Sequence, residues 1–255
     1  MIIESKDNKL IKYAKQIQIK KYSSQFGECF LETEKVVFDC LDKNMEVSTI
    51  FVLNTSLKKY EKRLKNVSSN IYQITQKIAD ILSQTSSGAD IFACAKIPNK
   101  FIDLKYDIVV LEGLQDPANI GAIIRSALAF NFKNIIAINS VYPYVNKTIR
   151  SSMTYIFDCN YREMTFEEFK NFKEKNGIKI VVADMEGKDI STCDSFPKNL
   201  ALVIGNEGQG ISEKMKNLAD NVVSIKMENG VESLNASVSA SIIMNKIKEK
   251  NYVRS

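Results

Sequence analysis

From residue 107 onward, short apolar segments alternate with longer segments of helical periodicity. The apolar segments read "DIVVLEG", "NIIAIN", "IKIVVAD", "LALVIG" and "NVVSIKM". The helical segments read "DPANIGAIIRSALAFN", "TFEEFKNFKEKNG" and "SLNASVSASIIMNKIKEKN". A strand that is apolar along its whole length is buried on both faces, and strands that alternate with helices pair in parallel. This part of the chain is therefore predicted to form an α/β fold around a parallel sheet.

The first hundred residues follow a different pattern. Residues 1–22 have a helical rhythm, and "GECFLETEKVVFDCL" reads as a strand that runs into a helix. Three further strands ("STIFVLN", "NIYQIT" and "DIFACAKIP") and one helix ("QKIADILSQT") complete this segment. We expect a small α/β domain over residues 1–100, a linker near Pro98–Asp107, and a second domain over residues 106–255.

The composition excludes several kinds of site. The chain of 255 residues contains no histidine, which rules out Ser-His-Asp and Cys-His catalysis. Its five cysteines never occur in C-x-x-C spacing, so we expect neither a disulfide framework nor a metal site. The N-terminus lacks the apolar core of a signal peptide, and the apolar runs are too short to cross a bilayer. We therefore expect a cytoplasmic protein with no membrane partner.

The net charge of +5 is unevenly distributed. Residues 1–105 contain 17 lysines and arginines against 12 acidic residues, whereas residues 106–255 contain 18 of each. This asymmetry suggests an anionic partner, most plausibly a nucleic acid. A solvated, lysine-rich surface explains the charge equally well.

Three loops with unusual residues follow predicted strands, namely Glu112–Arg125, Gly205–Ser212 and Met227–Ser237. Ligands of parallel α/β sheets bind beyond the carboxyl ends of the strands, where such loops meet. The loop "GNEGQG" has neither the Walker spacing nor its lysine, and the carboxylate of Glu207 would repel phosphate oxygens. This disfavours an ATP-using phosphotransferase and favours a cationic or hydrogen-bond-donating ligand. Taken alone, the loop also fits an ordinary turn between a strand and a helix.

Taken together, the three loops resemble the three motifs of the SpoU, or TrmH-like, branch of the SPOUT superfamily. The first motif, N-x-G-x-x-x-R, is matched by Asn119, Gly121 and Arg125. The second, G-N-E-G-x-G, is matched by Gly205–Gly210, and the third by Ser233–Asn235. Members of this branch are S-adenosylmethionine-dependent RNA 2′-O-ribose methyltransferases. The first hundred residues resemble the family's substrate-binding domain, which is similar to ribosomal protein L30e, only in general form.

The resemblance implies a fold, a cofactor and partners. We expect an α/β-knot domain whose C-terminal end forms a deep trefoil knot, an exception to the rule against threaded chains. We also expect RNA as substrate and a homodimer through the C-terminal domain, with each active site drawing residues from both chains. No metal is implied. The residues implied for S-adenosylmethionine binding are Leu202, Gly205, Asn206, Gly208, Ile225, Met227, Ser233 and Leu234.

Arg125 is the first candidate for a catalytic residue. It stands within "AIIRSALAF", where a charge is unexpected if the helix is buried. A guanidinium is essentially never neutral, so a phosphate clamp that also polarises the 2′-hydroxyl is a safer role than a general base. The other residues implied for catalysis are Asn119, Glu207, Ser233 and Asn235.

These other residues have ordinary alternatives. Asn119 could open a helix, Glu207 could be a surface acid, and Ser233 could be the N-cap of the last helix.

Two places depart from the family pattern. Lys226 stands where the third motif usually has proline, and Thr154 and Tyr155 stand where the family has glycine and alanine. A missing glycine could change a close backbone approach near the cofactor or the dimer contact.

The sequence thus favours an RNA 2′-O-methyltransferase. A basic N-terminal domain before a neutral catalytic domain favours ribosomal RNA over transfer RNA as the substrate. A transfer RNA methyltransferase and a non-catalytic RNA-binding or ribosome-assembly protein of the same fold remain alternatives. The sequence does not distinguish housekeeping modification from antibiotic-resistance methylation, and it does not name the modified nucleotide.

Overall fold

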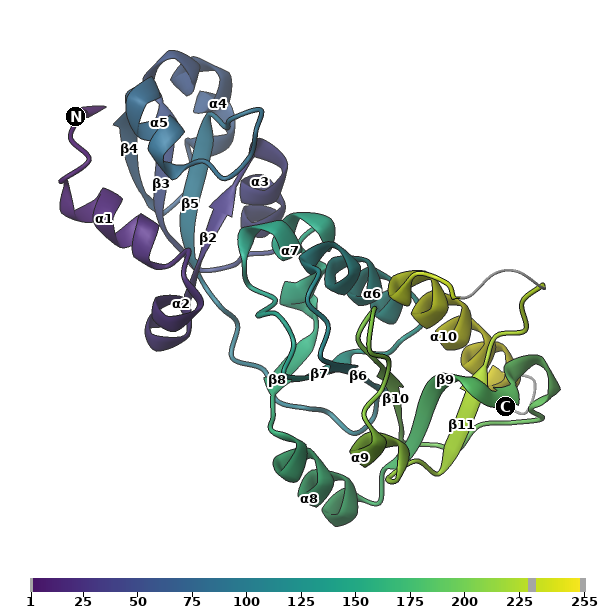
Figure 1. Ribbon diagram of the computed structural model, residues 1–255. Helices are drawn as coiled ribbons and strands as arrows, with labels where there is room; N and C mark the ends of the chain where they lie inside the picture. Colours follow the sequence, from purple (N-terminus) through teal and green to yellow (C-terminus); the bar gives the residue numbers. More distant parts are fainter. Residues whose placement is uncertain (1, 229–232, 253–255) are drawn as a thin grey trace. The chain divides into compact units, whose positions relative to one another are not determined.

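The computed structural model describes residues 2–228 and 233–252 and divides into two compact units (Figure 1). The first unit comprises Met1–Asn99 and Tyr144–Thr154, and the second comprises Lys100–Pro143 and Tyr155–Ser255. The sequence pattern assigned residues 144–154 to the second domain, but they pack within the first unit. Contact between α7 (Asn146–Ser151) and β2 (Glu28–Glu32) accounts for this difference.

The first unit contains a mixed sheet of five strands. β3 pairs in parallel with β4 and β4 with β1, whereas β5 runs antiparallel to both β3 and β2. The four predicted strands, β2 to β5, are confirmed. The segment 1–22, for which only a helical rhythm was expected, contains the short strand β1, and its helical part resolves into two helices. In spatial order the strands are β1 (Ile2–Ile3), β4 (Asn70–Ile74), β3 (Val47–Leu53), β5 (Ile91–Lys96) and β2 (Glu28–Glu32). The helical elements are α1 (Lys9–Gln16), α2 (Lys20–Phe26), α3 (Glu34–Asp42), η1 (Asn54–Ser56), α4 (Leu57–Leu64), α5 (Gln76–Leu82) and α7 (Asn146–Ser151).

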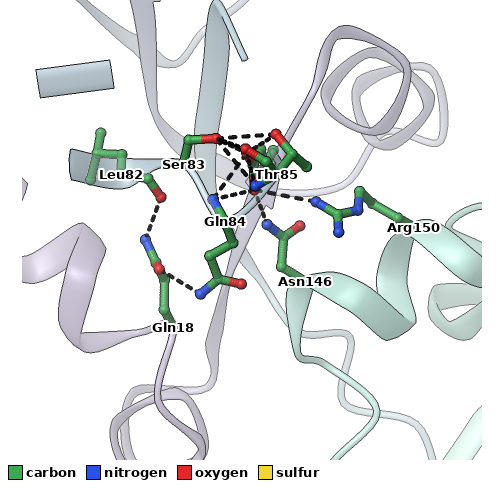
Figure 2. A network of polar contacts seen from close by, with 8 residues as sticks. Gln18, Leu82, Ser83, Gln84, Thr85, Asn146 and Arg150 are labelled. Carbon is green, nitrogen blue, oxygen red and sulfur yellow. Dashed lines mark hydrogen bonds and ion pairs between the residues drawn. The ribbon is translucent and has the colours of Figure 1, made fainter. Parts of the chain in front are cut away.

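The fully buried carboxylate of Glu32 organises one end of this sheet. It accepts hydrogen bonds from the Ser83 hydroxyl at 2.5 Å, the Thr85 hydroxyl at 2.7 Å, and the backbone N–H groups of Gln84 and Thr85. From α7, the side chains of Asn146 and Arg150 also donate to it (Figure 2). A buried charge is tolerated only where hydrogen bonds and counter-charges replace its hydration, and these donors supply both.

Two threonines of the first unit adopt backbone conformations that normally belong to glycine. Thr33 has φ 86° and ψ 150°, and Thr154 has φ 63°. A β-branched residue is strained at positive φ because its Cβ crowds the backbone. Glycine was expected at the position of Thr154 from the resemblance, and the backbone there has a glycine-like conformation.

The second unit is built on a six-stranded sheet in which every pair of neighbours is parallel. The five predicted strands are confirmed; β8 was missed because its residues, "NYRE", are polar. In spatial order the strands are β11 (Asn221–Ser224), β9 (Lys179–Asp189), β10 (Leu200–Ile204), β6 (Ile108–Glu112), β7 (Asn134–Ile138) and β8 (Asn160–Glu163). The helical elements are α6 (Pro117–Ala129), η2 (Tyr155–Asp158), α8 (Phe166–Asn176), η3 (Ile190–Thr192), α9 (Glu213–Lys216) and α10 (Ala236–Tyr252).

Helices cover this sheet, as the apolar strands predicted. Every residue of β7 and β10 is buried. Phe169 of α8 and Met215 of α9 belong to one core cluster together with alternate residues of the central strands. α6 and α10 pack against each other, and α10 also contacts β9 and β10. Strand order reverses between β6 and β10, a topological switch point of the kind at which α/β proteins bind ligands.

The structure confirms the α/β fold class with a parallel C-terminal sheet. The trefoil knot stays a prediction, as does the likeness of the first unit to L30e. Within the described ranges, no helix combines the length and apolarity needed to cross a bilayer.

Candidate functional site

The first two motif loops are joined at the carboxyl ends of β6 and β10. The Asn206 side chain donates to the carbonyl oxygen of Gly113 at 2.7 Å. Glu112, the last residue of β6, accepts from the backbone N–H and the hydroxyl of Ser212, the latter at 2.6 Å. The two loops therefore form one rigid edge at the switch point of the sheet.

The "GNEGQG" loop closes on itself. The backbone groups of Asn206 and Gly210 exchange two hydrogen bonds of 3.0 Å, and Asn206 Oδ1 accepts from the N–H groups of Gly208 and Gln209. A Cβ on Gly205 would lie 2.5 Å from the Gly210 backbone, whereas a Cβ on Gly208 would meet nothing closer than 3.6 Å. Gly205 is thus required by the loop's own packing, and Gly208 leaves space that a ligand can approach.

Three side chains from the three motifs form a hydrogen-bonded chain. Asn235 Nδ2 donates to Asn119 Oδ1 at 2.9 Å, and Asn119 Nδ2 donates to Glu207 Oε1 at 3.0 Å. The direction of the chain follows from its first member, because Asn235 Oδ1 accepts from the N–H of Ser237 at the start of α10. The Asn235 amide nitrogen must then face Asn119, which leaves the Asn119 amide nitrogen for Glu207. The N-terminus of α10 thereby fixes the orientation of both amides and of the Glu207 carboxylate.

Asn235 is therefore the N-cap of α10. Its side chain accepts from Ser237 and Val238, as an N-cap residue does. The alternative that Ser233 caps this helix is wrong, because α10 begins at Ala236. Ser233 instead lies exposed before the helix and lines a cavity.

This cavity has a volume of about 630 Å³ and lies beside the second and third motif loops. Its walls come from residues 183–186 after the buried part of β9, residues 204–211, Lys216, residues 223–225, Met227, residues 233–236, Ser239 and Ile243. Leu202 is fully buried within β10 and is not among the lining residues, and neither are Asn119 and Arg125. The predicted site residues that line it are Gly205, Asn206, Glu207, Gly208, Ile225, Met227, Ser233, Leu234 and Asn235.

Acidic side chains dominate the charge of the cavity. Among the lining residues that the structure describes, Asp184, Glu186 and Glu207 are acidic, and Lys216 is the one cation. Lys216 contacts Asp184 at 2.8 Å. Burial would raise the pKa of Asp184, but hydrogen bonds from Lys216 and from the Glu186 backbone outweigh it and lower that pKa. The lowered pKa keeps Asp184 ionised at neutral pH, and the acidic lining favours a cationic ligand over a phosphate.

Arg125 lies apart from the hydrogen-bonded chain. The interpretation of Arg125 as a charge in a buried part of the helix is wrong. α6 buries Ile120, Ile124 and Ala127, whereas Arg125 is exposed. It follows Asn119 by six residues, so at 3.6 residues per turn the two point to different sides of α6. Among the described residues, no hydrogen bond or ion pair holds its guanidinium.

Two groups were missed by sequence reasoning. Glu112 was recognised only as the start of a loop. A carboxylate at the end of a buried strand is by itself an indication of a candidate site residue. Residues 183–186 carried no motif, and only the end of an apolar strand marked them. Within the described ranges, no group of three or more metal-ligating side chains gathers anywhere in the chain.

Comparison with known proteins bears on this geometry. Residues 107–245 match the sequence model of the SpoU rRNA Methylase family. The chain belongs to this family. The matched SpoU segment runs from the start of β6 into α10 and contains all three motif loops.

Two curated SpoU relatives extend the match. The 23S rRNA (adenosine(1067)-2'-O)-methyltransferase of Streptomyces laurentii is 32% identical over 189 residues, 71% of this chain and 70% of that protein. The 23S rRNA (guanosine(2553)-2'-O)-methyltransferase RlmP of Bacillus subtilis is 23% identical over 250 residues, 95% of this chain and 97% of that protein.

A solved SpoU structure shares the fold. The SpoU methyltransferase AviRb from Streptomyces viridochromogenes, in complex with the cofactor AdoMet, matches with a TM-score of 0.86 and 21% identity. The match covers 96% of this chain and 98% of that one. The shared fold therefore extends over both units.

Proposed function

We propose that this protein transfers a methyl group from S-adenosylmethionine to a ribose 2′-hydroxyl of RNA, with ribosomal RNA as the substrate. The observation that carries the proposal is the chain from Asn235 through Asn119 to Glu207, which joins all three family motifs beside an acid-lined cavity. Both relatives described above are named as 23S rRNA 2′-O-methyltransferases. A ribosomal RNA substrate would put the activity in the cytoplasm.

The cavity fits S-adenosylmethionine in size and charge. Its volume of about 630 Å³ is in the range of small-molecule sites. A sulfonium and an ammonium group make this cofactor cationic overall, which suits a wall containing Asp184, Glu186 and Glu207. Backbone groups near Gly205, Ile225 and Leu234 would hold its adenine and ribose. When bound, the cofactor supplies an electrophilic methyl group.

The chain's own residues would then hold and activate the RNA. Glu207 and Asn119 are oriented by the N-terminus of α10 and would position the ribose. Arg125 would bind a phosphate and polarise the 2′-hydroxyl, since no histidine is available as a base. In this arrangement the hydroxyl proton would leave late and pass to water, as the new carbon–oxygen bond forms and the bond from the methyl carbon to the cofactor's sulfur breaks.

We further propose a homodimer through the second unit, in which Arg125 serves the partner's site. Its exposure, and its separation from Asn119 on the other side of α6, support this assignment. Most soluble oligomers are symmetric dimers, so each site would receive one arginine. The trefoil knot, with Leu202 contributing backbone groups behind the cavity, belongs to the same proposal. The first unit, which has the excess positive charge, would bind the RNA.

Methyl transfer from labelled S-adenosylmethionine tests the function directly. Purified protein is incubated with ribosomal RNA from cells that lack the gene, and the digested RNA is analysed for 2′-O-methyl nucleosides. We expect one labelled 2′-O-methyl nucleoside. Cofactor binding measured by calorimetry separates the alternatives, because a non-catalytic RNA-binding protein would bind RNA but not S-adenosylmethionine. If only transfer RNA became labelled, transfer RNA would be the substrate instead of ribosomal RNA.

The same assay tests the role of Arg125. We expect Arg125→Lys to lose at least about 90% of the activity, because an ammonium group does not reproduce the planar fork that grips a phosphate. Cofactor affinity should stay unchanged, since Arg125 does not line the cavity. Turnover close to that of the wild type would remove Arg125 from the mechanism.

A further inference from the structure

The first helices of the chain are strongly basic. Residues 1–27 contain six lysines and two acidic residues, while the whole chain has a net charge of +5. All six lysines are exposed. Within this segment, Lys12 forms an ion pair with Asp7 at 2.8 Å. α1 and α2 therefore form a basic surface of the first unit.

An exposed aromatic ring lies within this basic segment. Phe26, the last residue of α2, is 42% exposed. Its ring centroid lies 6.4 Å from that of Tyr22, with the planes 14° apart, and 5.5 Å from that of Tyr13. Lys21 Nζ lies 5.7 Å from the centre of the Tyr22 ring. Phenylalanine has no polar group that would account for its exposure, so its outer face is available to a partner.

Hydrogen bonds fix the aromatic cluster to the neighbouring parts of the first unit. The Tyr13 hydroxyl donates to Glu28 at 2.9 Å, and burial together with this bond raises the pKa of Tyr13 well above its usual value. The Ser23 hydroxyl fixes α2 to the Glu28 carbonyl oxygen at 2.7 Å. Between the two helices, Gln18 donates to Leu82 and accepts from Gln84 (Figure 2). A partner would therefore meet a preformed surface and lose little entropy in ordering it.

We propose that this α1–α2 surface binds an unpaired segment of the RNA substrate, with a base stacked on the exposed ring. Lysines alone fit a solvated surface, and an exposed aromatic ring alone fits a protein contact. Their combination matches single-stranded RNA, whose phosphates attract cations and whose bases stack on aromatic side chains. The inference rests on the proposed function for the identity of the RNA. The surface is defined as Lys15, Lys20, Lys21, Tyr22 and Phe26.

Two substitutions separate stacking from charge. Binding of a labelled single-stranded RNA oligonucleotide, and of ribosomal RNA, is measured by anisotropy and filter retention over a range of salt concentrations. We expect Phe26→Ala to weaken binding about tenfold, since stacking contributes roughly 1–3 kcal/mol per base, with no change in salt dependence. The double variant Lys20→Ala/Lys21→Ala should reduce the slope of log K against log salt by about 1.4, for two phosphate contacts.

Matched variants make the test specific. Phe26→Tyr should retain affinity, whereas Phe26→Leu, which keeps an apolar side chain without an aromatic face, should behave like Phe26→Ala. Full affinity in Phe26→Leu would overturn base stacking and indicate an apolar contact. The double variant Lys58→Ala/Lys62→Ala removes the same charge from α4, at the other end of this unit in Figure 1, and should leave the slope unchanged. Equal effects of the two lysine pairs would overturn the assignment of this surface.

The outcome is distinguishable from failure of the proposed function. Cofactor binding should be equal in all these variants, because the surface and the cavity are built from different residues. If the wild type binds RNA through this surface but transfers no methyl group, the proposed RNA-binding surface is supported and the proposed methyltransferase activity is contradicted. If the wild type methylates RNA and Phe26→Ala does so with an unchanged KM for RNA, the proposed RNA-binding surface is contradicted and the proposed methyltransferase activity is supported.

Discussion

Asn235 has two tasks that a single substitution can separate. Its Oδ1 caps α10, and its Nδ2 donates to Asn119. Asn235→Asp keeps a good cap but removes the donor, so the amides no longer have a fixed direction and Glu207 loses its oriented partner. We expect thermal stability within about 0.5 kcal/mol of the wild type, since aspartate and asparagine cap equally well, and a loss of most methyl transfer. Asn235→Ala loses both functions and should also be destabilised by about 1 kcal/mol. Full activity of Asn235→Asp in the RNA methylation assay would show that the chain is structural.

Thr154 offers a second test at the scale of one residue. Its φ of 63° suits glycine, and its side chain is buried. Gly and Ala at this position remove the same γ atoms, but only alanine keeps a Cβ in the left-handed region. We therefore expect Thr154→Gly to be more stable than Thr154→Ala by about 1 kcal/mol in urea unfolding. At Thr148, which lies within α7, the order should reverse, because glycine is about 1 kcal/mol worse than alanine in a helix. The same order of stability for the glycine and alanine variants at both sites would contradict backbone strain at Thr154.

At the scale of the element, α7 is held to the first unit by the Glu32 carboxylate. Glu32→Gln replaces one accepting oxygen by an amide nitrogen, which is itself a donor and faces other donors. It also removes the negative charge that faces Arg150 (Figure 2). We expect a loss on the order of 3 kcal/mol in the free energy of unfolding, typical of a broken buried ion pair. Asp42→Asn is the matched control, because it breaks the exposed pair with Arg63 and should cost less than about 1 kcal/mol. A loss of less than about 1 kcal/mol in Glu32→Gln would mean that apolar packing holds α7.

Element types were largely predictable, and the exceptions have two causes. Apolar strands and amphipathic helices are encoded in neighbouring residues, so β6, β7, β9 and β10 could be predicted from periodicity. β8 was missed because an edge strand needs few apolar residues. The position of α7 depends on polar contacts between residues 32 and 146, more than one hundred residues apart. No local pattern reports such a contact.

At the scale of the whole molecule, the motifs indicated which loops meet but not how the site is completed. The sequence predicted that Asn119, Glu207 and Asn235 would gather at the carboxyl edge of the sheet, and the structure brings them together. It did not predict the acidic wall from β9, because those residues acquire a role only once β9 lies beside β10. Nor could periodicity place Arg125, since a charge on a largely apolar helix reads as buried until the register of that helix is known.

The proposed sharing of sites between two chains makes a quantitative prediction. Arg125→Ala and Asn235→Asp should each be nearly inactive alone. If Arg125 acts in the partner's site, a mixed dimer contains one site with both defects and one site with none. Random reassembly makes half of the dimers mixed, so a co-refolded equimolar mixture should regain about a quarter of the wild-type activity. If Arg125 acts in its own chain's site, every site has one defect and the mixture stays inactive. Activity is compared before and after subunit exchange, and size-exclusion chromatography verifies that both variants remain dimers.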